Sequence, residues 1–371
     1  MKATKVAAVI VLILLAQVVT ARAASSSWTY TMSYTFENRG SEPQTLINDD
    51  VSFPYFNDTA WQTVKVVSVT PAAGPIYPDE DGNRLAQASM SLIIPPGKNF
   101  TYTVVYQIDS SDRTKPVIDE SKAGAISDIP SGIPSSYLSH TTTFQANNQQ
   151  IASLAESLTE NQPTVLAKLL RLVHWLNANI TYDSYEVPRL ANETLTGRKG
   201  DCDDQAILLI SMLRSIGVPA YLELGVVFGS NLTDKETIWY GHLGIDERGL
   251  GWHGWAMVYV PPWGWLPVDL TLIRESDPLE AIRNAPEYGA SVVSALRISS
   301  QDYVMDSRLS RLRIIASTIY VSSSDVVTYP SGQQWWLYPA VAVLGVAVAG
   351  SVAFMFYSAR RRTPPEQGQT I

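Results

Sequence analysis

Cysteine is almost absent from this sequence: among 371 residues, Cys202 is the only one. The chain therefore cannot form an intramolecular disulfide, whatever compartment it occupies. In an oxidising compartment a lone thiol is a chemical liability, so its presence there indicates that it has a function.

Positive charge is also scarce. Lys and Arg total 27 residues against 35 Asp and Glu, which gives a formal net charge of −8 at pH 7. A surface with this excess repels polyanions, so we expect no nucleic-acid partner. The sequence has no metal-binding cluster, phosphate loop or dinucleotide fingerprint, and we predict that the protein uses neither a metal nor a cofactor.

Charge is missing from a short segment near the start of the chain. Lys2 and Lys5 precede an apolar run of fourteen residues at 6–19, and Ala21-Arg22-Ala23 provides small residues at which signal peptidase would cut. This pattern predicts a signal peptide over residues 1–24. A bilayer core needs about 20 apolar residues, so an uncleaved N-terminal anchor is the weaker alternative.

A second uncharged segment runs from Trp335 to Tyr357, with aromatic residues at both edges. Its length and composition predict a transmembrane helix, and a buried core helix is the weaker alternative. Three arginines at 360–362 follow the span, which favours a cytoplasmic tail at residues 358–371. We therefore expect a single-pass protein of the cell membrane whose globular part is extracellular.

Acceptor sites for N-linked sugars would fit an exported protein. Five Asn-x-Ser/Thr sequons occur, although such short patterns also arise by chance in a sequence rich in Ser and Thr. The predicted glycosylation sites are Asn57, Asn99, Asn179, Asn192 and Asn231.

Residues 25–110 predict an all-β domain of immunoglobulin-like sandwich type. Segments suited to strands at 28–36, 63–70, 89–94 and 99–108 are separated by clusters of Gly, Pro and Asp-Gly. No motif here carries chemistry, so we assign this domain a packing, spacing or binding role. Residues 111–148 are rich in Ser, Pro and Asp and predict a linker over the surface.

Residues 149–330 predict a second domain, of α+β class. Helical spacing is found at 151–158 and 163–179, and the segment 202–213 predicts a helix that is apolar on nearly every side and therefore buried. Strands are expected at 221–228, 252–260 and 265–270. Residues 271–332 mix a short helical pattern with a β-branched run and contain no recognised motif.

Cys202 is expected at the N-terminus of the buried helix. A cysteine attacks as the thiolate, and the unpaired N–H groups and positive dipole end of a helix N-terminus stabilise that anion. Asp201, Asp203 and Asp204 act in the opposite direction, because negative neighbours disfavour a thiolate. The thiol therefore requires a cationic partner, and a histidine would serve.

His253 and Asp269 are expected to face each other across a hairpin. If the turn is centred near Pro261 and Pro262, positions 253 and 269 are equidistant from its centre. Residues directly opposite in an antiparallel pair have Cβ atoms about 4.5 to 5.5 Å apart, which permits a hydrogen bond between carboxylate and imidazole. Asp269 would then fix the ring tautomer and stabilise the imidazolium.

Three segments resemble the motifs of the transglutaminase-like superfamily. Residues 200–206 (GDCDDQA), continuing to 213–220 (LRSIGVPA), resemble its cysteine motif, 253–255 (HGW) its histidine motif and 264–269 (GWLPVD) its aspartate motif. Their order and spacing also agree. The resemblance covers roughly residues 160 to 275 and implies a papain-like α+β core, in which the nucleophile begins the helix and its partners come from the adjoining sheet.

The resemblance implies roles for these residues. Cys202 would be the nucleophile, His253 the general base and acid and Asp269 the orienting carboxylate in acyl transfer from protein or peptide amides through a thioester. The backbone N–H of Cys202 is the expected first donor of the oxyanion hole. Candidates for the second donor are Tyr182, Trp252 and Trp239.

Several alternatives stay open. Hydrolysis is favoured over transfer to an amine, because water is always available outside a cell and the signatures of calcium sites and of extra C-terminal β-domains are lacking. His242 is the alternative to His253, although it has no opposed carboxylate. A non-catalytic surface module would instead bind proteins or glycans through the predicted sandwich and a tryptophan-rich face around Trp252, Trp255, Trp263 and Trp265.

Overall fold

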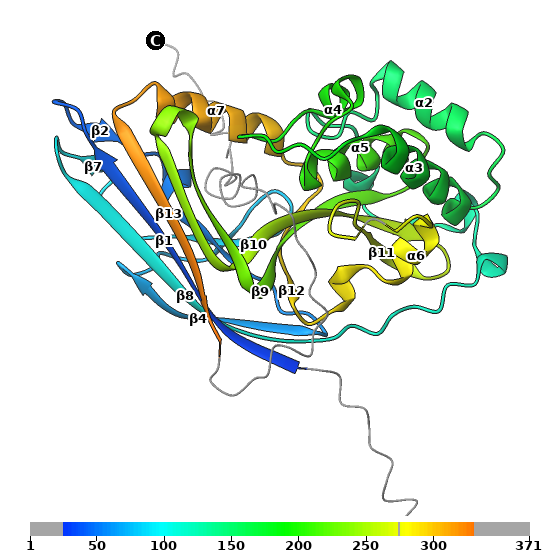
Figure 1. The fold of residues 1–371 in the computed structure, drawn as a ribbon, viewed down its shortest axis with the longest axis horizontal. Coiled ribbons are helices and arrows are strands. Elements are labelled where there is room, and N and C mark those ends of the chain that lie inside the picture. Colours follow the sequence, from blue (N-terminus) through cyan, green and yellow to red (C-terminus); the bar gives the residue numbers. More distant parts are fainter. Residues whose placement is uncertain (1–24, 274, 330–371) are drawn as a thin grey trace, which may run out of the picture.

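The computed structural model describes residues 25–273 and 275–329 (Figure 1). The predicted signal peptide at 1–24, the predicted transmembrane helix at 335–357 and the tail at 358–371 lie outside these residues. In the described part of the chain, no helix has the length and apolar character needed to cross a membrane.

One eight-stranded sheet runs through the molecule. All its neighbouring strands are antiparallel except β10 and β13, which are parallel. The strand order is β12 (Val292–Ile298), β9 (Ala220–Ile238), β10 (Leu243–Val260), β13 (Ile319–Thr328), β1 (Ser25–Asn38), β8 (Asn99–Ser111) and β4 (Gln62–Thr70), with β11 (Gly264–Val268) added beside β10.

The predicted separate immunoglobulin-like sandwich at 25–110 is not confirmed. Strand β1 pairs along most of its length with β8 on one side and with β13 on the other. Strand β13 comes from the far end of the described chain and also pairs with β10. The strands predicted at 28–36, 63–70 and 99–108 do form, but they extend the sheet that carries the second predicted domain.

A short second layer covers the N-terminal strands. It contains a three-stranded and a two-stranded sheet. The Tyr106 phenol on β8 connects the three-stranded sheet to the main sheet. Its hydroxyl donates to the Pro54 carbonyl at 2.9 Å, and its ring stacks on that of Tyr30 with centroids 5.3 Å apart. These small sheets consist of β3 (Ser52–Tyr55), β6 (Arg84–Gln87) and β5 (Tyr77–Pro78), and of β2 (Gln44–Thr45) and β7 (Ile93–Ile94), with the 3₁₀ turn η1 (Asn48–Val51) before β3.

Helices gather at the other end of the sheet, over β9 and β10 (Figure 1). The predicted helices at 151–158, 163–179 and 202–213 are confirmed, and the last of these is buried from Cys202 to Arg214. It ends at Ser215, and Gly217 follows the C-cap with a φ of 80°, which glycine adopts without strain. The helices are α2 (Gln149–Thr159), α3 (Val165–Asn179), α4 (Ala191–Gly197), α5 (Cys202–Ser215), α6 (Pro278–Arg283) and α7 (Tyr303–Ile315).

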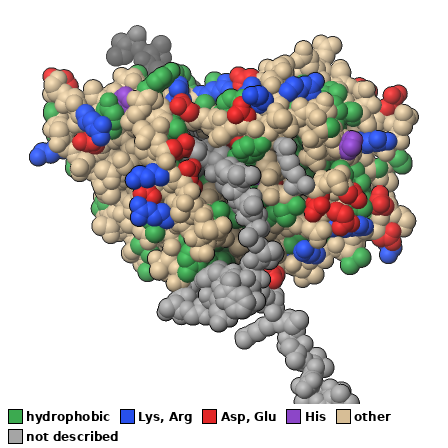
Figure 2. Space-filling view, viewed as in Figure 1, with side chains coloured by type: hydrophobic (Ala, Val, Ile, Leu, Met, Phe, Trp, Pro, Cys, Tyr) green, Lys and Arg blue, Asp and Glu red, His purple; other side chains and the backbone are tan. Residues whose placement is uncertain are grey.

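The segment between β8 and α2 has no strand after Ser111 and contains the 3₁₀ turns η2 (Glu120–Lys122), η3 (Ile126–Asp128) and η4 (Ser135–Tyr137). Backbone hydrogen bonds tie it to its surroundings, because Gly124 donates to Pro261 and accepts from Val165, both at 2.9 Å. This segment therefore joins the turn between β10 and β11 to the start of α3. Figure 2 shows acidic and basic side chains interspersed on the face that it displays.

Candidate active site

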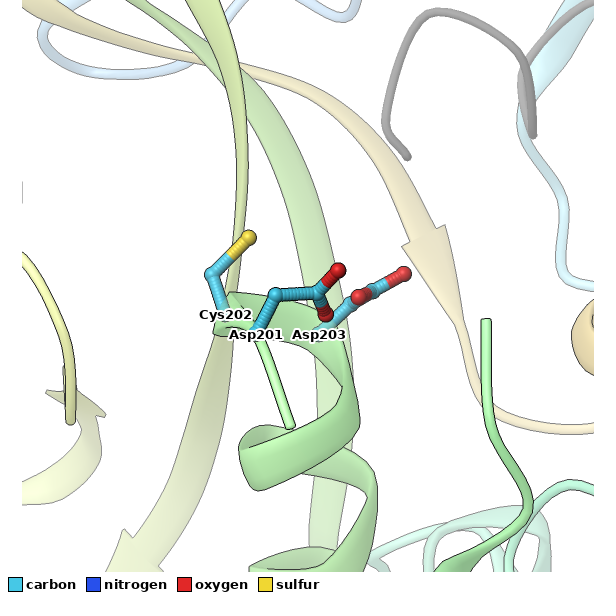
Figure 3. Close-up of side chains that lie close together, drawn as sticks. All are labelled: Asp201, Cys202 and Asp203. Atoms are coloured by element: carbon cyan, nitrogen blue, oxygen red, sulfur yellow. The ribbon is translucent and has the colours of Figure 1, made fainter. Parts of the chain in front are cut away.

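Cys202 is the first residue of α5, as the sequence predicts. Asp201 is the N-cap, and its side chain accepts from the Asp204 backbone N–H, while the Asp204 carboxylate accepts from the Asp201 N–H. This reciprocal capping fixes where the helix begins. The side chains of Asp201, Cys202 and Asp203 consequently project together from the N-terminal end of α5 (Figure 3).

The Cys202 thiol is buried, with 6% of the residue exposed. Burial raises the pKa of this thiol well above its usual value, and the charges of Asp203 and Asp201 raise it further. A hydrogen bond from the Gly254 backbone acts in the opposite direction and lowers the pKa. The resting cysteine is therefore a neutral thiol.

Two of the acids beside the thiol have raised pKa values. Burial, followed by the charge of Asp203, raises the pKa of Asp204 to about 8, and the same two causes raise the pKa of Asp201 well above its usual value. Asp203 itself accepts a hydrogen bond from Tyr303 at 2.6 Å. Asp201 and Asp204 are therefore protonated more easily than free aspartates, which reduces the opposition to a thiolate that three fully ionised acids would create.

His253 and Asp269 form a buried pair. His253 Nε2 lies 2.6 Å from Asp269 Oδ2, and the exposed fractions of the two residues are 1% and 4%. Although burial alone would raise the pKa of Asp269, the His253 charge and hydrogen bond hold it at about 2. An ionised carboxylate only accepts hydrogen bonds, so Nε2 carries the proton and Nδ1 is free to act as a base.

The other carboxylate oxygen of Asp269 is also held. Its Oδ1 atom accepts from the backbone N–H of Thr271 at 2.7 Å and of Leu272 at 2.9 Å. Two backbone donors on one oxygen and the imidazole on the other fix the plane of the carboxylate. The histidine ring is fixed in turn, because its Nε2–H must point at that carboxylate.

The contact between His253 and Asp269 is confirmed, but the predicted register is wrong. Pairing runs from Val260 with Gly264 to Ala256 with Val268, so the turn is centred on Pro262. Continued beyond Val268, this register would place Asp269 opposite Trp255. Moving the centre by one residue moves every partner by two positions, so Asp269 stays on the face of the sheet that carries His253.

Gly254 brings the thiol to this pair. Its backbone hydrogen-bonds the Cys202 sulfur, and it directly follows His253. A Cβ atom at Gly254 would lie 3.0 Å from Asp203 Cβ and 3.1 Å from Leu224 Cδ2, closer than side-chain contacts normally are. The missing side chain thus lets the first turn of α5 rest on β10 beside the histidine.

Residues 152–270 match the family model of the transglutaminase-like superfamily. The chain contains a transglutaminase-like domain. The family is one of thiol enzymes, and the match spans all three predicted motifs. No curated protein shows significant similarity to the chain.

One solved structure has a similar fold over most of this chain, and two further structures match it less well. A protein from Cytophaga hutchinsonii, provisionally described as a cysteine protease, is 17% identical with a TM-score of 0.53, over 87% of this chain and 97% of that one. The periplasmic domain of TgpA from Pseudomonas aeruginosa, bound to ethylmercury, is 16% identical over 71% of this chain and 77% of that one, with a TM-score of 0.32. Red sea bream transglutaminase is 11% identical over 69% and 49%, with a TM-score of 0.26.

Among the candidates for the second oxyanion donor of this transglutaminase-like domain, Tyr182 lies beside the thiol. Burial raises the pKa of Tyr182, and Cys202 is the next largest cause. The other two candidates are tryptophans whose indole rings contact other parts of the fold. Trp239 Nε1 donates to the Glu186 carbonyl at 3.1 Å, and the Trp252 ring packs edge-on against Phe56 with centroids 6.2 Å apart.

The alternative histidine belongs to a different part of the fold. His242 follows the 3₁₀ turn η5 (Trp239–Gly241), with Nδ1 2.8 Å from the Ile319 carbonyl oxygen. Its ring stacks on Tyr320 with centroids 4.3 Å apart. These contacts place His242 against β13, whereas His253 is the histidine that faces Asp269.

The tryptophan-rich face of the binding-module alternative is largely interior. Trp252 is fully buried and Trp255 is 1% exposed, with its ring 5.7 Å from that of His253. Trp263 and Trp265 are half-buried, and Trp263 Nε1 donates to the Val117 carbonyl at 3.1 Å. Two of the four rings therefore serve the core of the transglutaminase-like domain.

The predicted glycosylation sites differ in exposure. Asn57, Asn99, Asn179 and Asn231 are exposed. Asn192 is only half-buried within α4, and its side-chain oxygen is enclosed. Surface access thus favours the other four sequons as acceptors, and their glycosylation stays a prediction.

Sequence reasoning missed Glu287, which stands beside the pair. It lies in the 3₁₀ turn η6 (Pro286–Tyr288), is fully buried, and places Oε1 4.0 Å from His253 Nε2. Ligand atoms of His253, Asp269 and Glu287 all lie within 4.8 Å of one another, as do those of Asp201, Cys202 and Asp203, so each set has donors that could hold a metal ion. No sequence spacing indicated either set, and Glu287 falls in the stretch without a motif.

Proposed function

We propose that this protein is a transglutaminase-like thiol hydrolase that cleaves protein or peptide amides outside the cell. The observation that carries the proposal is the buried hydrogen bond between His253 and Asp269, beside a thiol at a helix N-terminus. The sequence patterns at 1–24 and 335–357 support anchoring in the cell membrane with the enzyme on the outer side.

The geometry supports a general-base mechanism. Cys202 Sγ attacks the amide carbon while His253 Nδ1 takes the thiol proton, and Asp269 stabilises the imidazolium that forms. The amine then leaves with that proton, which gives a thioester on Cys202. A water molecule attacks the thioester with His253 again as base, and hydrolysis releases the acid and restores the thiol.

The electrostatics require that proton transfer accompany attack. Since the thiol has a raised pKa, a thiolate without a cation beside it is scarce at neutral pH. Asp269 remains ionised above a pH of about 2, so its negative charge is available to the imidazolium throughout the physiological range. Water is favoured as the acceptor over a lysine amine for the reason that it is always present outside a cell.

The proposal predicts that His253 controls the reactivity of Cys202. Because Cys202 is the only cysteine, iodoacetamide labelling of the full-length protein in detergent reports on this thiol alone. At pH 7, well below the ordinary cysteine pKa of about 8.5, we expect the wild type to react about 10²-fold faster than His253→Ala. The second-order rate constant, measured from pH 5 to 10, is the readout.

His242→Ala is the matched control, because it removes a histidine that contacts β13 and not Asp269. It should react like the wild type. Equal, slow labelling of the wild type and His253→Ala would sink the enzyme proposal and leave a transglutaminase-like binding module in its place.

Tyr182→Phe is expected to lower kcat for hydrolysis of p-nitrophenyl acetate by about 10²-fold, with little change in KM. The phenol next to Cys202 would donate to the oxyanion only as the tetrahedral intermediate forms, so its removal affects the transition state. Tyr185→Phe, the loss of a phenol three residues along the same loop, serves as the control. A Tyr182→Phe enzyme with unchanged kcat would remove Tyr182 from the oxyanion hole.

A further inference from the structure

Glu287 is a buried carboxyl group that the proposed mechanism does not use. It is fully enclosed, and apart from the neighbouring Asp269 carboxyl group neither of its carboxyl oxygens has a side-chain hydrogen-bond partner in the described part of the chain. Its Oε1 atom lies 4.0 Å from His253 Nε2, and a ligand oxygen lies within 4.8 Å of Asp269. An enclosed carboxyl group whose nearest partner is another carboxyl group is costly, so its place behind the pair requires an explanation.

Two adjacent buried carboxyl groups cannot both be ionised at low cost. Asp269 has four donors for its negative charge: the His253 ring, the backbone N–H and the hydroxyl of Thr271, and the backbone N–H of Leu272. Hydrogen bonding from the backbone of Glu287 itself lowers the pKa of Glu287, but burial and Asp269 outweigh it. The charge therefore belongs on Asp269 and the proton on Glu287.

The surrounding charges agree with this assignment. Burial raises the pKa of Glu287 well above its usual value, and Asp269 raises it further. Arg113 lowers it by a smaller amount. The Arg113 guanidinium packs 4.5 Å from the Trp61 ring centroid, and its Nη2 lies 3.3 Å from Ser294 Oγ. The remaining titratable neighbours are His253 on β10 and Tyr288 beside Glu287 in η6.

We propose that Glu287 is a positioning residue that keeps its proton and offers a neutral carboxylic acid to Asp269, which holds the Asp269 carboxylate in place behind His253. The inference rests on the proposed function of the triad. The hydrogen bond between the two side chains lowers the pKa of Asp269 and raises that of Glu287, as expected if the acid donates its O–H to the carboxylate. The imidazole then stays aimed at the thiol while Asp269 retains its charge.

Two substitutions separate this role from simple space filling. Glu287→Gln keeps the shape and supplies an N–H donor to Asp269, so it imitates the protonated acid. Glu287→Met keeps most of the volume and removes the donor. A group that only fills space would be replaced as well by Met as by Gln.

The first measurement is the infrared difference spectrum between wild type and Glu287→Gln at pH 7. We expect a carboxylic-acid C=O stretching band that is present in the wild type and lost in the variant. Glu247→Gln makes the same change in another buried glutamate, at the far end of β10, and controls for general effects. A carboxylate band in place of the acid band would overturn the proposal, whether or not the protein is an enzyme.

The second measurement is the iodoacetamide labelling rate of Cys202 in the same full-length variants. Glu287→Gln should stay within about threefold of the wild type and keep the midpoint of its pH profile, whereas Glu287→Met should react at least about tenfold more slowly with a displaced midpoint. If Glu287→Met does not fold, Glu287→Gln remains decisive, because a loss of tenfold or more there overturns the inference.

The remaining outcomes are distinguishable. If the wild type and His253→Ala are labelled at the same rate, the proposed function is wrong. If His253→Ala is labelled more slowly but Glu287→Met is labelled like the wild type, only the inference about Glu287 is wrong. A wild-type rate that changes with EDTA or added Zn²⁺, with loss of that response in Glu287→Met, would show that His253, Asp269 and Glu287 bind a metal and would overturn the assignment of the proton.

Discussion

Asp269→Asn is expected to lower kcat/KM for hydrolysis of p-nitrophenyl acetate by about 10⁴-fold, as removal of the charge of a triad carboxylate does elsewhere. The backbone donors at Thr271 and Leu272 decide how the new amide lies. They require an acceptor, so the amide oxygen takes the place of Oδ1 and the NH₂ group faces His253 Nε2. The histidine must then carry its proton on Nδ1, where it cannot accept one from the thiol.

This variant tests the tautomer of His253 as well as the charge. Asp325→Asn is the matched control, because Asp325 is also fully buried and accepts from the Tyr30 phenol at 2.5 Å, but lies on β13. Burial raises the pKa of Asp325 to about 6, so a neutral side chain suits its site, and we expect near-normal hydrolysis. An Asp269→Asn enzyme with hydrolysis within tenfold of the wild type would contradict the triad.

Gly225→Ala is expected to destabilise the protein by about 3 kcal/mol or more, or to prevent folding. Gly225 pairs with His253 on one side and with Ser294 on the other. A Cβ atom there would lie 2.3 Å from the Val293 carbonyl oxygen and 2.7 Å from Trp255 Cη2. Neither neighbour can withdraw easily, because one is strand backbone and the other is a buried indole stacked on His253.

Urea unfolding followed by tryptophan fluorescence measures this effect. Gly244→Ala is the control, since Gly244 lies in β10 of the same sheet and a Cβ atom there meets nothing within 4 Å. We expect that control to stay within about 1 kcal/mol of the wild type. Equal stability of the two variants would show that the backbone around Gly225 moves to make room for the added methyl group. The close approach of β9 and β12 would then not require glycine at this position.

The nucleophile and its helix were predictable because their determinants are local. The N-cap at Asp201, the apolar run of α5 and the glycine at 217 act over a few residues each. Motif spacing likewise identified His253 and Asp269 as partners. Their hydrogen bond was predicted even though the register was wrong, because a two-position change of partner keeps a side chain on the same face.

Residues that act at the site through burial were not predictable. Glu287 lies 18 positions after Asp269 in a stretch without a motif, and only the fold brings η6 behind the pair. The raised pKa values of Asp201 and Asp204 were equally hidden, since a pKa depends on burial and on neighbouring charges. Sequence alone shows three acids beside the thiol, whereas the structure shows that two of them are buried with raised pKa values.

By itself, the sequence determined the local elements of this protein and the three motif residues at its site. The alternation of apolar and polar residues at 28–36 predicts a strand, because the faces on which successive side chains lie depend only on the local backbone conformation. The tertiary structure decided that β13 enters between β1 and β10 and joins the two predicted domains into one sheet. Partner choice depends on which surfaces meet when segments nearly 300 residues apart pack together, and no local pattern records that.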